Sequence, residues 1–169
     1  YAQAVQKVSG GAMAGDEVEV VDPQGRVLGR DLYSPSFAIV VRLYTRERGV
    51  AIDASLFRAR IARAVERRRM LDLPSPDTNA YRVVHAEGDD LSGLIVDRLG
   101  SALVCEYHSL GFWRLREEIA SALSELYPGF PVHHRVPKSA RSSEGFEPRG
   151  EEPLADEVWI TENGQIGRA

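Results

Sequence analysis

The chain has 169 residues and a formal net charge of −4, with 43% hydrophobic and 27% charged residues. This composition is typical of a folded globular protein and excludes intrinsic disorder as the default state. The acidic balance also argues against a protein that coats nucleic acid over its whole surface.

Residues 17–45 have the pattern of β structure. The alternation in EVEVVD predicts a strand from residue 17, and Pro23 and Gly25 predict the turn after it. Residues 26–32 predict the returning strand. The apolar run FAIVVRLYT, residues 37–45, predicts a third and mostly buried strand. Short strands joined by tight turns favour a small barrel or sandwich.

A helix is predicted over residues 53–71, capped by Asp53 or Ser55 and ended by the prolines after Leu73. A domain boundary is predicted just before it, at residues 48–52. Helical spacing predicts the core face of this helix: Phe57, Ile61, Ala64 and Val65. Three basic residues at spacings of three and four form a stripe along one flank: Arg60, Arg63 and Arg67.

Three apolar runs between residues 81 and 107 predict three strands, joined by a Gly/Asp-rich loop and a Leu-Gly-Ser turn. A second helix is predicted over residues 110–127 and a short strand over 132–136. The polar residues 137–156 predict a long loop. Residues 157–161 predict a last strand, followed by the turn dipeptide Asn163-Gly164. No partner strand is expected beyond that turn, and the unpaired edge would favour a homodimer.

Charge is unevenly distributed along the chain. Residues 53–72 contain six arginines against three acids, whereas residues 144–162 contain seven acids against Arg149. Two different neighbours are therefore expected for these segments. Cys105 is the only cysteine and cannot form an intrachain disulfide, which favours a reducing, cytoplasmic setting. The chain begins at Tyr1 rather than methionine and is expected to be part of a longer protein.

Four segments resemble the large-subunit ribosomal RNA cytosine-5 methyltransferases that carry a PUA domain, a middle β/α domain and a Rossmann-like methyltransferase domain. The most specific is YRVVHAEGDDLSGLIVDRLG, residues 81–100; the others are residues 15–45, residues 53–71, and RSSEGFEPRG followed by WITENG. The segment of residues 15–45 includes a Gly-Arg-x-Leu-Tyr-Ser-Pro turn, Gly29 to Pro35. Two positions depart from the family pattern, which usually has glycine at Asp90 and proline at Ser92.

The resemblance implies an α+β fold in two parts. Residues 1–50 would form a small PUA-like β-barrel that binds RNA. Residues 51–169 would form a β/α domain of the strand-strand-helix-strand-strand type, and the Rossmann-like methyltransferase domain would be absent from this chain. S-adenosylmethionine is implied for the whole protein, but no cofactor or metal site is expected within these residues.

The candidate RNA contacts lie in both parts of the chain. Phosphates attract arginine without regard to base sequence. The predicted RNA-binding residues are Arg26, Arg30, Arg42 and Arg46 in the barrel and Arg60, Arg63 and Arg67 on the helix. Each could instead be a solvated surface charge. Tyr33 and Tyr44 could stack on bases or belong to the core.

Other polar groups favour structural roles. Glu87, Asp89 and Asp90 are expected to form a turn between strands, with acid–base catalysis or docking of the missing domain as alternatives. The four histidines lack the spacing of a zinc site, and Cys105 is expected to be a buried thiol.

The function expected from these patterns is recruitment of ribosomal RNA for cytosine-C5 methylation by a domain outside this chain. The residues present are expected to have no enzymatic activity. The alternative is a non-catalytic adapter that docks through its acidic segment, residues 144–162. A third hypothesis, a hydrolase that uses Asp89 and Asp90, rests only on their proximity in sequence.

Overall fold

The structure, a computed structural model, describes residues 5–36, 40–47, 49–151 and 157–168. Strands β1 (Glu17–Val21) and β2 (Val27–Leu32) form an antiparallel hairpin. Its turn is fixed by Asp22, whose carboxylate accepts hydrogen bonds from the backbone NH groups of Gln24 and Arg26, both at 2.9 Å. The predicted first turn is therefore confirmed, and strand β2 continues through Leu32, so most of the predicted Gly29–Pro35 turn is strand.

The predicted third strand is largely wrong. Residues 37–39 lie outside the described part of the chain, and from residue 40 to 45 only Thr45 pairs with β2, through an isolated bridge to Arg30. At this bridge the Arg30 NH donates to the Thr45 carbonyl and the Tyr44 NH donates to the Arg30 carbonyl, both at 2.9 Å. The side chain of Tyr44 is buried against Phe112, with ring centroids 5.2 Å apart. Within residues 5–36 and 40–47, the strands therefore form an open hairpin with one added bridge rather than a closed barrel.

Helix α1 (Ala54–Arg69) confirms the predicted helix and its cap. The Asp53 carboxylate accepts hydrogen bonds from the backbone NH groups of Ser55 and Leu56, which satisfies two of the otherwise free donors of the first turn. All four residues of the predicted core face are buried: Phe57, Ile61, Ala64 and Val65.

A four-stranded sheet forms the centre of the molecule. Its strands are β3 (Ala80–His85), β4 (Leu94–Leu99), β5 (Ala102–Tyr107) and β6 (Val132–Arg135), in that spatial order. The first three are antiparallel neighbours, and β6 is parallel to β5. The expected strand-strand-helix-strand-strand order is therefore wrong: the tight turn at Gly100 and Ser101 places a third strand before the next helix.

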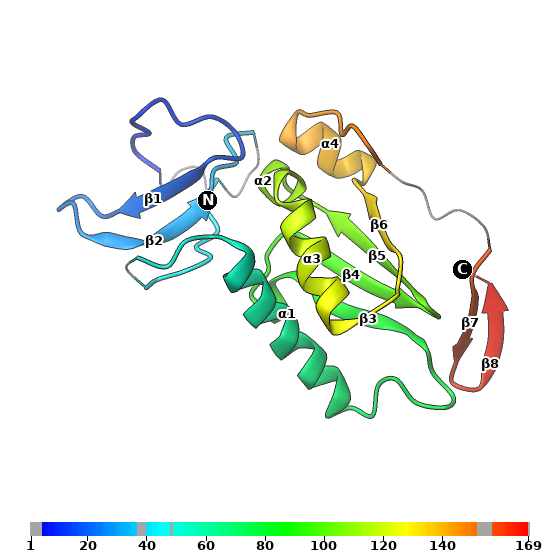
Figure 1. The fold of residues 1–169 in the computed structure, drawn as a ribbon. Coiled ribbons are helices and arrows are strands. Elements are labelled where there is room, and N and C mark those ends of the chain that lie inside the picture. The colour runs from blue at the N-terminus through cyan, green and yellow to red at the C-terminus, as the bar shows by residue number, and fades with distance from the viewer. Residues whose placement is uncertain (1–4, 37–39, 48, 152–156, 169) are drawn as a thin grey trace.

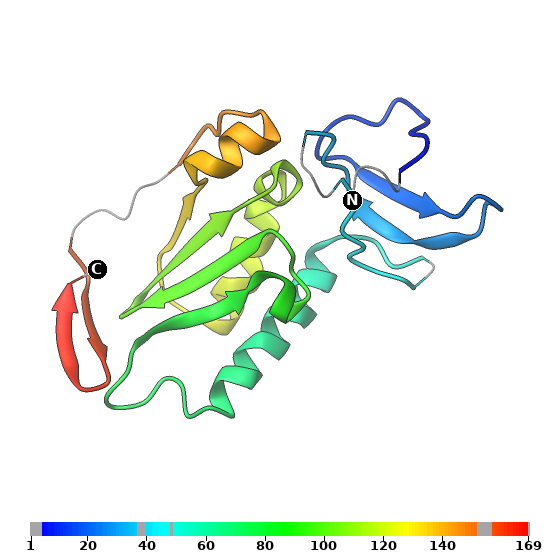
Figure 2. The same cartoon turned by 180° about the vertical axis from the view of Figure 1, so that it is seen from behind.

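Helices cover one face of this sheet. α2 (Leu110–Arg114) and α3 (Arg116–Leu126) replace the single predicted helix and connect β5 to β6. Helices α1 and α3 pack on the same face (Figure 1), whereas the view from behind shows the opposite face without a helix over it (Figure 2). No helix in the described ranges has the length and apolar character needed to cross a membrane.

The C-terminal region differs most from the prediction. A short helix, α4 (Lys138–Glu144), lies inside the predicted loop. The Asn163-Gly164 turn is confirmed, but the strand expected to be absent is present: β7 (Trp159–Glu162) pairs with β8 (Gln165–Arg168). The edge on which the homodimer expectation rested is therefore paired within the chain.

One cluster of buried side chains crosses the predicted domain boundary. Leu32 and Tyr44 from the N-terminal part share this core with Phe57 of α1 and Phe112 of α2. The contact is close, since a Cβ at Gly111 would lie 2.6 Å from the Cβ of Leu32. The hairpin region, residues 5–36 and 40–47, is thus packed directly against the sheet and its helices.

Candidate nucleic-acid interface

Two of the four predicted barrel arginines are ion-paired within the hairpin. Arg26 contacts Asp22 at 2.6 Å in the β1–β2 turn, although its side chain is largely exposed. Arg30 contacts Glu17 across the two strands at 2.7 Å. The sequence alternation that predicted these strands also placed opposite charges on one face of them.

The other two, Arg42 and Arg46, have different surroundings. The backbone NH of Arg42 donates a 2.9 Å hydrogen bond to the buried Asp31, and Arg42 has a further interaction partner. Arg46 is exposed and forms no ion pair with any residue that the structure describes. Of the two predicted stacking tyrosines, Tyr44 is a core residue, while Tyr33 is half-buried. Of these four predicted arginines, Arg46 is therefore the one that is exposed and has no ion pair among the described residues.

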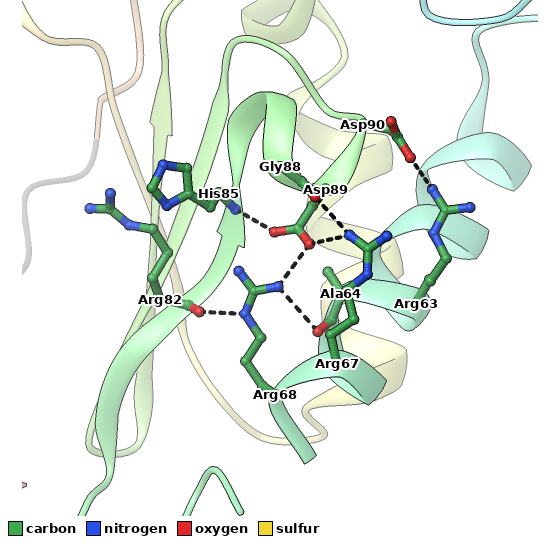
Figure 3. Close-up of polar contacts among 9 residues, drawn as sticks. All are labelled: Arg63, Ala64, Arg67, Arg68, Arg82, His85, Gly88, Asp89 and Asp90. Atoms are coloured by element: carbon green, nitrogen blue, oxygen red, sulfur yellow. Dashed lines mark hydrogen bonds and ion pairs between the residues drawn. The ribbon is translucent and has the colours of Figure 1, made fainter. Parts of the chain in front are cut away.

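Two arginines of the α1 stripe, Arg63 and Arg67, face the turn between β3 and β4, where the short helix η2 (Ala86–Asp89) lies (Figure 3). Arg63 forms an ion pair with the Asp90 carboxylate. Arg67 contacts the Asp89 carboxylate at 2.9 Å and the Gly88 carbonyl at 2.7 Å. The basic stripe and the acidic loop, predicted as separate features, are partners.

Arg60, the third member of the stripe, points towards the N-terminal part. Its guanidinium donates hydrogen bonds to the carbonyl oxygens of Asp90 and Tyr44. Burial lowers the pKa of this guanidinium, the nearby Arg63 lowers it further, and Asp90 raises it. Arg60 therefore joins the hairpin region to the β3–β4 turn through two hydrogen bonds.

Asp89 is the buried centre of this cluster, with only 3% of its side chain exposed. It also contacts Arg68 at 2.7 Å and accepts a 2.7 Å hydrogen bond from the backbone NH of His85. Burial alone would raise the pKa of Asp89, but the hydrogen bonds from Arg68, His85 and Arg67 outweigh it and lower the pKa. A carboxylate held ionised by two arginines is a poor proton donor, which does not support the hydrolase hypothesis.

The backbone of the turn explains why the neighbouring Asp89 and Asp90 side chains lie in different environments. Asp90 has left-handed backbone geometry, with φ 59°, and its NH donates to the Glu87 carbonyl. This reversal directs the two neighbouring carboxylates to different environments. On the other side of the turn, Glu87 accepts a 2.5 Å hydrogen bond from the Ser92 hydroxyl, which lowers the pKa of Glu87 despite partial burial. No sequence signal marks which of the acids is buried.

The acidic C-terminal segment is partly used inside the fold. Glu144 is buried and accepts a 3.0 Å hydrogen bond from the Ser34 hydroxyl. Glu151 pairs with Arg141, and Glu157 pairs with Arg168. Residues 152–156 lie outside the described part. These internal contacts give the adapter hypothesis no added support.

The cysteine and histidines have structural environments. Cys105 is buried, and burial raises the pKa of its thiol to about 12, so it is a poor nucleophile. The Tyr107 hydroxyl and His134 Nδ1 are 2.8 Å apart, and His108 contacts Glu106 at 2.7 Å. Among the described residues, no group of three or more His, Cys, Asp or Glu could hold a metal ion.

Asp31 makes the stability of the folded protein depend on pH. Burial raises its pKa to about 6, although hydrogen bonds from the NH groups of Arg42 and Leu32 act in the opposite direction. The unfolded value is about 3.9. The folded state therefore binds more protons than the unfolded state between about pH 4 and pH 6, and stability falls as the pH rises through this window.

We expect Asp31→Asn to remove this fall. Urea unfolding at pH 4.5 and pH 7 should show that wild type loses about 2 kcal/mol more than the variant between the two pH values. Contributions from other groups are common to both proteins and cancel in this difference. Equal losses in the two proteins would contradict the assigned ionisation of Asp31.

Two surface hollows do not fit S-adenosylmethionine. One, of about 620 Å³, lies along β1 and is lined by residues 5–12 and by acids that include Glu17 and Glu19. The other, of about 410 Å³, lies between β3, β4 and β7 and contains the Arg82–Asp97 pair, whose atoms are 2.9 Å apart. Neither has the Gly-rich strand-to-helix loop typical of nucleotide-cofactor sites. No chemical step through the methyl donor follows from these residues.

Comparison with known proteins agrees with this architecture. A family model described as a PUA-like domain matches residues 1–46. Ribosomal RNA large subunit methyltransferase I of Tolumonas auensis is 37% identical over 171 residues, covering 98% of this chain and 43% of that protein. The protein of the same name from Shewanella frigidimarina is 38% identical, covering 97% of this chain and 42% of that protein. This chain is a homologue of these methyltransferases.

The chain spans about two-fifths of the length of the methyltransferase I proteins that it matches. A solved structure, SMU.776, named as a candidate methyltransferase complexed with SAH, matches with a TM-score of 0.74 and 19% identity. That match covers 92% of this chain and 40% of the other. It supports the α+β fold over both parts of the chain. The resemblance to large-subunit ribosomal RNA methyltransferases with a PUA domain is confirmed by the similar proteins and the family model.

Proposed function

We propose that this chain is the RNA-recruiting part of an S-adenosylmethionine-dependent methyltransferase that modifies cytosine C5 in large-subunit ribosomal RNA. The observation that carries the proposal is the PUA-like match at residues 1–46 within a chain homologous to ribosomal RNA methyltransferases. The hairpin region would hold RNA through phosphate contacts, with residues 1–50 as the RNA-binding domain and 51–169 as the middle domain.

The side-chain contacts reduce the number of predicted arginines that are available to bind RNA. Arg46 is exposed and without an ion pair among the described residues, and Arg26 is largely exposed beside Asp22. Both can reach a phosphate without breaking a buried contact. Arg60, in contrast, would have to abandon two carbonyl partners. We therefore assign Arg26 and Arg46 the larger share of RNA affinity within the hairpin region.

Binding of fluorescent large-subunit ribosomal RNA transcripts across a salt series tests the proposal. Wild-type affinity is expected to fall steeply between about 50 and 200 mM salt, because arginine–phosphate contacts release counterions. The double change Arg26→Ala and Arg46→Ala should weaken binding. It should also reduce the slope of log K against log salt by roughly 0.7–0.9 for each phosphate that is no longer neutralised.

Arg58→Ala is the matched control. Arg58 pairs with Glu125 at 2.7 Å, and about half of its side chain is exposed. This variant removes one positive charge from a different surface and should shift affinity only slightly. Absence of binding at low salt, or binding insensitive to salt, would contradict RNA recruitment by these residues.

A further inference from the structure

Two neighbouring acids contact the arginine stripe in different ways. The Asp89 side chain is 3% exposed, whereas that of Asp90 is 56% exposed. Asp89 is bound by Arg67, Arg68 and a backbone NH, so it is fixed within the fold. Among the described residues, the Asp90 carboxylate has one ion-pair partner, Arg63. Only the second acid is placed where a ligand from solution could replace it.

The arginines beside Asp90 are held ready for an anion. Arg67 is held in place by contacts with the Asp89 carboxylate and the Gly88 carbonyl, yet 45% of its side chain is exposed. Arg63 lies one turn earlier on the same flank of α1, and 51% of its side chain is exposed. Two adjacent, partly immobilised guanidinium groups match the oxygens of a phosphate group.

Replacing the Asp90 carboxylate at Arg63 by another anion costs little free energy. An exposed ion pair contributes about 0–1 kcal/mol, because solvent and salt screen it. Asp90 also adopts the left-handed backbone region, with φ 59°, where a non-glycine residue is strained and glycine is favoured. The carboxylate at this position is therefore not required by the shape of the turn.

We propose that Arg63 and Arg67 bind a backbone phosphate of RNA, and that Asp90 occupies this site in the free protein as an exchangeable counter-ion. This inference rests on the proposed RNA-binding function and assigns a second contact surface to it, on α1. The phosphate replaces the carboxylate at Arg63, while Asp89 continues to hold Arg67. Asp90 thus lowers the affinity of the site without closing it.

The test compares Asp90→Asn with Asp97→Asn in the same RNA-binding assay. Both variants remove one negative charge, and Asp97 is also a partly exposed acid paired with an arginine, Arg82. Asp90→Asn is expected to bind RNA about two- to five-fold more tightly than wild type, the equivalent of one weak surface pair. Asp97→Asn should show at most a small gain from the change in net charge.

Two further variants keep the result interpretable. Asp90→Gly suits the left-handed backbone and should retain or raise stability while binding RNA as tightly as Asp90→Asn. Adding Arg63→Ala to Asp90→Asn should abolish the gain in affinity. Equal affinities for the Asp90 and Asp97 variants, or a gain that survives Arg63→Ala, would overturn the phosphate site.

This design separates the two proposals. If wild type binds RNA with the expected salt dependence but the Asp90 variants match the Asp97 control, only the α1 phosphate site is lost. If neither wild type nor Asp90→Asn binds RNA at low salt, both proposals are wrong. The Arg26 and Arg46 variants test the hairpin surface independently of α1.

Discussion

Replacement of Asp89 by alanine is expected to lower the free energy of unfolding by about 3 kcal/mol. The change removes the carboxylate that Arg67 and Arg68 share and leaves Arg68, only 14% exposed, without its ionic partner. The backbone NH of His85 also loses its acceptor. An unpaired, poorly solvated cation is the main source of the loss, because its desolvation is no longer compensated.

Chemical denaturation of the variant, with Asp90→Asn as the neighbouring control, measures this effect. Asparagine tolerates the left-handed backbone at this position, so Asp90→Asn removes only an exposed ion pair and should cost less than about 1 kcal/mol. The difference between the two variants is the decisive quantity. Similar losses for both would show that the burial of Asp89 has little energetic importance.

Gly29→Ala is expected to be as harmful, with a loss of about 3 kcal/mol or more. A Cβ at this position would lie 2.1 Å from the carbonyl oxygen of Thr45, and the glycine has φ 155°. That oxygen accepts the 2.9 Å hydrogen bond from the Arg30 NH that attaches residues 40–47 to β2. The methyl group would force this segment away from the hairpin.

Thermal unfolding followed by tryptophan fluorescence tests the change at Gly29. Gly25→Ala is a suitable control, because this glycine also has positive φ, 78°, but its Cβ would meet no atom within 4 Å. It should therefore report backbone strain alone, about 1 kcal/mol. A Gly29→Ala protein as stable as the Gly25→Ala protein would contradict the close approach of Thr45.

Local patterns predicted local structure well. The core face of α1 followed from Phe57, Ile61 and their neighbours, since helical spacing fixes which side chains share a face. The three strands between residues 80 and 107 and the Asn163-Gly164 turn were also recognisable, from apolar runs and turn residues. In each case the determining residues lie within a few positions of one another.

Features set by distant contacts were missed. The burial of Glu144 depends on Ser34, 110 residues away, and the local sequence of α4 predicts a loop. The burial of Tyr44 depends on Phe112, which lies 68 positions later in the chain. Likewise, the partnership of Arg63 and Arg67 with the acidic turn depends on the left-handed geometry at Asp90. The arginine stripe could be located from sequence, but its counter-ions could not.

The shared core at the junction has a mechanical consequence. Leu32 and Tyr44 lie in the same buried cluster as Phe57 and Phe112, so the hairpin region cannot swing freely on the sheet. The surfaces around Arg46 and Arg63 therefore belong to one rigid unit and keep a fixed separation. An RNA that contacts both must present phosphates at the separation set by the protein. Folded RNA can hold such a separation, whereas a flexible strand loses conformational entropy in adopting it.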